Sequence, residues 1–165
     1  MKRGIKTIMI SAAALLALIS VLAYADYRSV RIGNESGPVL YRRLLGALSE
    51  GPVLRMRDIT PFEWDHLYVF QPYTTRGQME QKVGRRWTTS RSFAAYVAER
   101  LRLGNDPLKD ATQQKLVFVK QGIVVAEVTL DRTESDFVPA LEPLTPETAA
   151  FVVEGHRILP EERRP

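Results

Sequence analysis

Residues 62–73 read FEWDHLYVFQPY and form the densest apolar stretch outside the N-terminus. In an extended chain the even positions share one side, and Leu67 and Val69 share the other. Aromatic and β-branched residues that are apolar on both sides favour a strand covered on two faces. We therefore expect a central strand near residues 64–71. Pro72 ends its ladder because proline has no N–H to donate.

The same stretch supplies the first candidate binding site. An exposed platform of Trp64, Tyr68 and Tyr73 would suit a glycan or a peptide, but the apolar opposite face favours a core role for these rings. Asp65 and His66 are neighbours whose side chains point apart in a strand, so we expect Asp65 to cap a nearby turn or helix. The candidate binding or structural motif comprises Trp64, Asp65, Tyr68, Phe70, Pro72 and Tyr73.

Helices are predicted on both sides of this strand in the sequence. One opens at Pro38, which suits a first helical position, and ends before Gly51-Pro52. Thr75 and Gln78 match a capping box for a second helix, which Gly84 closes. A third helix is expected to start at Ser90, with Phe93, Val97 and Leu101 as its apolar stripe and residues 104–107 as its terminator.

Two β-branched runs, residues 116–120 and 123–130, are separated by Gln121-Gly122. This spacing predicts a hairpin, because glycine supplies the positive φ that the turn needs. Residues 146–158 combine a helix-start signature with β-branched residues and stay open between helix and strand. The whole pattern predicts an α+β fold: a small antiparallel or mixed sheet of three to four strands, with helices packed mainly on one face.

The N-terminus has a cationic start followed by an uncharged apolar run. Lys2, Arg3 and Lys6 precede Thr7–Ala25, which carries no charge and ends in small-x-small, as a secretion signal does. This pattern favours a cleaved signal peptide, but 19 uncharged residues also reach the lower limit for spanning a bilayer, so an uncleaved anchor is the alternative. The expected organisation is a signal peptide or membrane anchor (1–25), a polar spacer (26–37), a single α+β domain (38–160) and a frayed tail (161–165).

Charge and cysteine content restrict the possible partners. The chain carries a formal net charge of +4, but three of its 23 Lys and Arg residues and none of its 19 acidic residues lie in residues 1–25. The remainder is therefore nearly neutral, and no nucleic-acid partner is expected. The absence of cysteine excludes disulfides, thiolate metal sites and cysteine nucleophiles, and fits an exported bacterial domain.

The residues show no catalytic, metal-binding or cofactor-binding constellation. His66 and His156 are the only histidines, so a three-histidine metal site is impossible. No G-x-S-x-G motif or glycine-rich phosphate loop is present. Carboxylate pairs such as Glu127 and Asp131 could in principle cleave a glycosidic bond, but they lie in or beside a polar loop, where charge normally means solvation. We assign no catalytic, cofactor or metal residues.

Two blocks carry a family resemblance: WDHLYVFQPYT at residues 64–74 and LVFVKQGIVV at residues 116–125, with Gly84 and Trp87 between them. These blocks resemble a group of small uncharacterised bacterial exported or membrane-anchored proteins. The resemblance implies a small α+β domain that is exported or tethered at a membrane. It supplies no catalytic residues.

We therefore expect a non-enzymatic exported bacterial protein, periplasmic or anchored in the inner membrane by residues 1–25. Its expected role is to bind or modulate another cell-envelope component, either an envelope protein or a cell-wall component. The alternative is an envelope hydrolase with an unrecognised carboxylate or histidine site.

Overall fold

The computed structural model describes residues 2–101, 108, 110–139 and 143–161, with side chains from residue 11 onward. Helices and two small sheets alternate along these residues, which confirms the predicted α+β class. The helices are α1 (Lys2–Val30), α2 (Ser36–Glu50), α3 (Met56–Ile59), α4 (Arg76–Val83) and α5 (Phe93–Leu101). The strands are β1 (Val53–Arg55), β2 (His66–Phe70), β3 (Gln113–Lys120), β4 (Ile123–Asp131), β5 (Asp136–Phe137), β6 (Ala150–Glu154) and β7 (Arg157–Pro160).

The chain divides into two compact units. The first combines Met1–Arg31 with Thr88–Leu103, and the second combines Ile32–Trp87 with Gly104–Pro165. Within the first unit, α5 packs against α1. The tail beyond residue 161 lies outside the described residues.

The second unit holds two sheets where one was expected. The three-stranded sheet is antiparallel in the order β2-β3-β4, and the four-stranded sheet has the order β1-β6-β7-β5 with β5 and β7 parallel. The prediction that the aromatic strand is central is wrong: the β3–β4 hairpin places β3 in the middle. β2 lies at the edge, where, among the residues that the structure describes, an isolated bridge joins Leu67 to Leu144.

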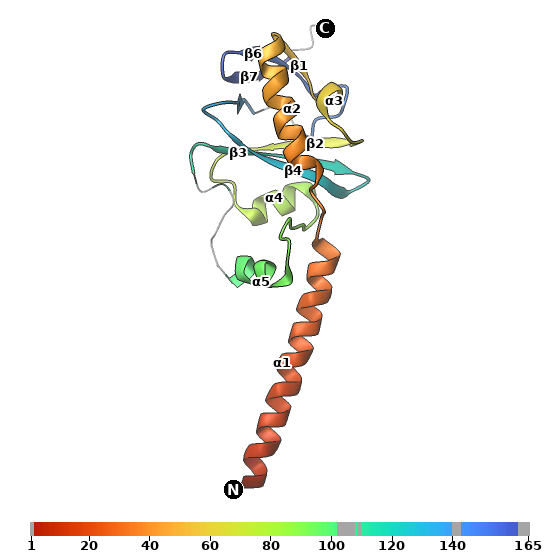
Figure 1. Ribbon diagram of the computed structural model, residues 1–165, viewed down its shortest axis with the longest axis vertical. Helices are drawn as coiled ribbons and strands as arrows, with labels where there is room; N and C mark the ends of the chain where they lie inside the picture. Colours follow the sequence, from red (N-terminus) through yellow and green to blue (C-terminus); the bar gives the residue numbers. More distant parts are fainter. Residues whose placement is uncertain (1, 102–107, 109, 140–142, 162–165) are drawn as a thin grey trace. The chain divides into compact units, whose positions relative to one another are not determined.

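Both faces of the three-stranded sheet are buried, as the two-sided apolar pattern predicted. Helices cover both faces, however: α2 packs on one and α4 on the other (Figure 1). The α2-side core also takes residues from the four-stranded sheet and includes Leu40, Leu44, Leu54, Trp64, Leu67, Val69, Leu116, Phe118, Phe137, Phe151 and Ile158. The α4-side core comprises Tyr68, Phe70, Met79, Trp87, Leu108, Val117, Val119 and Val124.

The predicted turns and caps hold locally. The β3–β4 turn has positive φ at Gln121 and Gly122, and Gln121 N–H donates to an Asp65 carboxylate oxygen at 2.6 Å. The capping box of Thr75 and Gln78 begins α4. Residues 146–158, for which the sequence allowed either a helix or a strand, form a turn followed by most of the β6–β7 hairpin.

α1 continues beyond the expected boundary at residue 25 and ends only at Val30. Residues 26–30 of the expected spacer are therefore helical, because no Gly or Pro interrupts the chain between Ile5 and Ile32. Within the described residues, Ser11–Val30 is long and apolar enough to cross a membrane, with a mean hydropathy of 1.4.

α5 lies close to its predicted position, but it buries a different face. Tyr96 is buried, whereas Leu101 is 74% exposed. The expected stripe of Phe93, Val97 and Leu101 is therefore wrong. α5 is packed by aromatic contacts with α1, and its predicted terminator at residues 104–107 lies outside the described residues.

Candidate functional site: a groove between α2 and β4

The structure separates the aromatic residues of the candidate motif. Trp64 precedes β2, is 5% exposed, and packs its ring edge-to-face on Phe118, with the ring centroids 5.4 Å apart. Its indole N–H donates to Thr60 Oγ1 at 3.0 Å. Tyr68 and Phe70 are buried on the opposite face, with their rings stacked 6.1 Å apart. These three rings belong to two cores and form no common platform.

The polar and turn residues of the motif lie at the ends of β2. Asp65 caps the β3–β4 turn through Gln121 N–H, the role that its position favoured. Pro72 follows the strand, and Tyr73 is 67% exposed with a positive φ of 64°. Tyr73 is therefore the only ring of the motif that is exposed to a ligand.

The second unit has a groove between α2 and β4, with a volume of about 450 Å³. We call it the α2–β4 groove. One wall is the N-terminal part of α2 with the preceding loop, and the other is the outer edge of β4, which pairs with β3 alone among the described strands. Its lining residues are Asn34, Gly37, Pro38, Tyr41, Arg42, Glu127, Val128 and Thr129.

A close approach of the backbone shapes one end of this groove. A Cβ on Gly37 would lie 2.7 Å from the carbonyl oxygen of Glu127, so only glycine lets α2 approach β4 here. Asn34 Oδ1 accepts the Glu127 backbone N–H at 2.8 Å. In an antiparallel pair, the backbone N–H and C=O groups of every second residue point away from the partner strand. Those of Glu127 point away from β3, and the same therefore holds for exposed Thr129.

The groove's carboxylate is fully engaged. Glu127 Oε1 accepts from Lys115 Nζ at 2.9 Å, and Glu127 Oε2 accepts from Trp87 Nε1 at 2.7 Å. The Lys115 and Glu127 side chains are only 7% and 13% exposed. Burial acts to raise the pKa of Glu127, but the charge and hydrogen bond of Lys115, the Trp87 hydrogen bond and the charge of Arg76 together outweigh it, and the pKa is lowered. The side chain is therefore ionised and held on two sides.

The remaining polar groups near the groove do not supply an acid–base pair. Tyr41 donates its phenol O–H to Glu134 Oε2 at 3.0 Å. That hydrogen bond, with burial and nearby negative charge, raises the pKa of Tyr41, so the phenol stays protonated at neutral pH. Hydrogen bonds from the Thr133 backbone and hydroxyl lower the pKa of Asp131. A glycosidase needs a carboxyl with a raised pKa as its acid, and neither Glu127 nor Asp131 is one.

The histidines do not form a metal centre with other ligands in the described residues. His66 lies in β2, and exposed His156 lies in the β6–β7 turn. Among the side chains that the structure places, no group of three His, Asp or Glu residues could hold a metal ion.

The fold and the groove define an α+β domain that follows an apolar N-terminal helix and has a groove beside a sheet edge. No protein-family model, curated protein or solved structure matches the chain significantly.

The sequence reasoning missed the residues that make the groove. Asn34 and Gly37 were assigned to a spacer, and Lys115 was not singled out. One local signal was available: Asn-x-x-Gly immediately before Pro38 is typical of a turn that leads into a helix. The contact between Lys115 and Glu127 depends on the β3–β4 register. Lys115 lies opposite Thr129, so Glu127 is its diagonal neighbour on the same face.

Two glycines of α2 provide a matched prediction. Gly37→Ala should lower the free energy of unfolding by about 1–3 kcal/mol, because the new methyl meets the Glu127 backbone. Gly46→Ala, in the same helix with nothing within 4 Å of the new Cβ, should raise it by about 0.5–1 kcal/mol. Urea unfolding of the full chain in detergent micelles measures both. Equal shifts in the same direction would contradict the close approach of α2 and β4.

Proposed function

We propose that this protein is a non-enzymatic, exported bacterial protein that α1 holds in the inner membrane, and that its periplasmic α+β domain binds another envelope protein. The proposed binding site is the α2–β4 groove. The observation that carries the proposal is a groove beside a β4 edge that no other described strand pairs, in which the Glu127 carboxylate and the Tyr41 phenol already have partners.

The anchor is favoured over cleavage by the path of α1. Residues 23–26 lie within a helix that runs to Val30. Tyr24 packs edge-to-face on Phe93 at 5.4 Å, and Tyr27 is 3% exposed. Cleavage after Ala25 would first require this packed helix to open. Lys2, Arg3 and Lys6 then favour a cytoplasmic N-terminus, with the α+β domain outside.

A polypeptide segment suits the groove because it can use both walls. The outward N–H and C=O of Thr129 can pair with an extended chain, as in recognition by strand addition. Pro38 and the Tyr41 ring offer apolar contact, and exposed Arg42 lines the groove where it can meet an acidic group of the partner.

The hydrolase alternative would need an ionisable group that is available to a substrate. Glu127 is bound by Lys115 and Trp87, and Tyr41 is bound by Glu134. These contacts support a binding groove over a catalytic one.

Site-specific photocrosslinking in cells tests the binding site. A photoreactive residue at Thr129 or at Arg42 should give one discrete adduct with an envelope protein. A matched probe at Arg43, which is exposed on α2 but does not line the groove, should give none. Arg42→Glu should abolish the adduct at Thr129, whereas Arg43→Glu should leave it unchanged.

Equal adducts at all three positions would contradict a specific groove. Release of soluble product from purified cell wall by the full chain, lost on Glu127→Gln, would establish the hydrolase instead.

A further inference from the structure

The first unit joins the end of α1 to the segment that contains α5. The ring centroids of Tyr27 and Tyr96 are 5.4 Å apart, and the Tyr27 hydroxyl donates to the Ser90 carbonyl at 3.1 Å. Backbone contacts reinforce the aromatic ones, because Thr88 N–H donates to the Val30 carbonyl at 2.8 Å. Residues 24–31 and 88–101 therefore form one packed element, which we call the α1–α5 collar.

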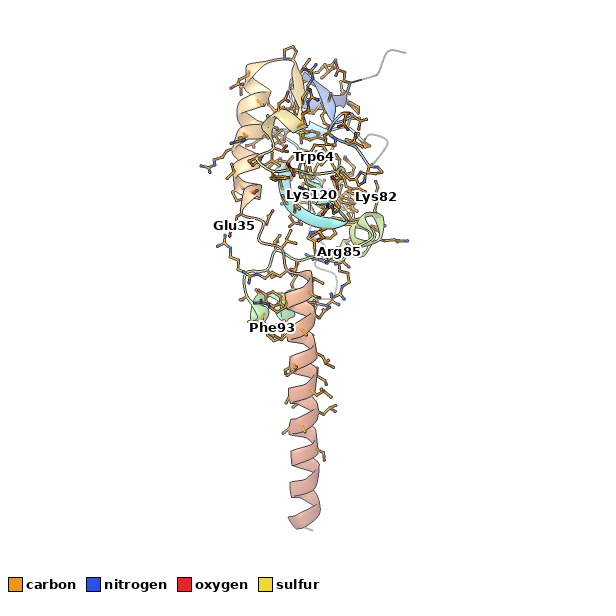
Figure 2. All side chains as sticks on the ribbon, turned by 90° about the vertical axis from the view of Figure 1, so that its right-hand side faces the viewer. Glu35, Trp64, Lys82, Arg85, Phe93 and Lys120 are labelled. Carbon is orange, nitrogen blue, oxygen red and sulfur yellow. The ribbon has the colours of Figure 1, made fainter. Side chains whose placement is uncertain are left out.

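The outer side of the collar is apolar. α5 buries Tyr96 but exposes Leu101 and its alanines, while Phe93 lies against α1 (Figure 2). α1 also exposes most of its large apolar residues from Leu15 to Tyr24. The exposed apolar residues of α5 are Ala94, Ala95, Ala98 and Leu101.

The charged groups of the collar are asymmetric. Its acidic side chains are engaged within it: the Asp26 carboxylate accepts from Tyr96, and Glu99 accepts from Ser90 Oγ at 2.7 Å. Its arginines are all exposed, and two of them lie against rings, with Arg31 over Tyr27 and Arg100 over Tyr96. The exposed arginines are Arg28, Arg31, Arg91 and Arg100.

These features lie at one depth along α1. The hydrocarbon core of a bilayer spans about 20 helical residues. The uncharged run at residues 7–25 is close to that length and ends at the collar. Tyrosines enriched at this level, an amphipathic helix and exposed arginines are the features of a membrane–water interface.

We propose that the α1–α5 collar is a membrane-interface element. The exposed apolar face of α5 lies in the headgroup layer, and the collar arginines bind the phosphates of anionic lipids. Each arginine near an anionic surface is attracted by the surface potential, so the contact depends on lipid charge and on ionic strength. The inference rests on the proposed anchoring by α1.

The absence of cysteine allows a direct test on the full chain. Single-cysteine variants Ala98→Cys and Leu18→Cys, with Gln81→Cys on α4 as the exposed control, are labelled with an environment-sensitive fluorophore. The proteins are reconstituted in phosphatidylcholine vesicles with or without phosphatidylglycerol, and with lipids spin-labelled near the headgroup. The label at Ala98 should be quenched several times more than the label at Gln81, and more strongly when phosphatidylglycerol is present.

Charge variants separate lipid binding from simple proximity. Arg91→Gln with Arg100→Gln should reduce quenching at Ala98 in anionic vesicles to its level in neutral vesicles. Arg91→Lys with Arg100→Lys should retain most of it, and raised salt should act as the glutamine pair does.

Two results would overturn the inference, and they are distinguishable. If the label at Leu18 is quenched by deeply spin-labelled lipid while Ala98 matches Gln81, the anchor stands and the collar does not contact lipid. If Leu18 is not quenched, both the anchor and the collar fail. Quenching at Ala98 that is independent of lipid charge would overturn the binding of anionic phosphates.

Discussion

Trp64→Ala should lower the free energy of unfolding by about 3–5 kcal/mol, the range expected when a buried tryptophan is removed from a packed core. The ring packs on Phe118 in the α2-side core, where helix α2, the four-stranded sheet and the three-stranded sheet meet. Its loss also leaves Thr60 Oγ1 without the indole donor. Urea unfolding of the full chain in micelles, followed by circular dichroism, measures the change.

Tyr73→Ala is the matched control, since Tyr73 belongs to the same motif but is exposed. It should change the free energy of unfolding by no more than about 0.5 kcal/mol. If Trp64→Ala were as mild as Tyr73→Ala, Trp64 would not be a core residue and the assignment of this motif would be wrong.

Lys115→Met should also be strongly destabilising at neutral pH, by about 3–5 kcal/mol, because it leaves the buried Glu127 carboxylate without its cation. The partner substitution tests whether the charge is the cause. Lys115→Met with Glu127→Gln removes both charges and keeps an acceptor for Trp87 Nε1, so it should recover at least about 2 kcal/mol of the loss. No recovery would show that packing, and not charge, dominates at Lys115.

The pH dependence of this pair has a defined sign. The folded-state pKa of Glu127 is lowered below its ordinary value of 4.5, so its contribution to stability is fully present above that value. The contribution is lost as the pH falls through the lower folded-state pKa. In Lys115→Met the carboxyl is buried without its cation, and protonation relieves it. The difference in unfolding free energy between the wild type and Lys115→Met should therefore shrink in acid, and a constant difference would contradict the ion pair.

Local signals in the sequence predicted individual elements well. The capping box at Thr75, the closing Gly84 and the Gln121-Gly122 turn each depend on residues within a few positions of one another. Such contacts depend on the local backbone conformation and not on how distant parts of the chain pack.

Predictions that required long-range pairing were less successful. β2 was expected to be central, but strand order depends on which strands pair, and β3 pairs with β4 on one edge and with β2 on the other. Val124 lies two residues before Ala126, so a regular strand would place both side chains on the same face. The register shift between Phe118 and Val119 instead places Val124 in the α4-side core. The buried face of α5 depended on Tyr27 of α1, a residue assigned to a spacer.

Composition and local pattern were sufficient for the α+β class, the apolar N-terminal helix, the caps and the hairpin, because these follow from backbone preferences and hydrophobic periodicity. The α2–β4 groove, the Lys115–Glu127 pair and the collar came only from the folded chain. Each depends on a contact between residues far apart in sequence: Gly37 with the Glu127 backbone, Trp87 with Glu127, and Tyr27 with Tyr96. Burial and desolvation act on neighbours in space, and those neighbours exist only after the strands have paired and the helices have packed.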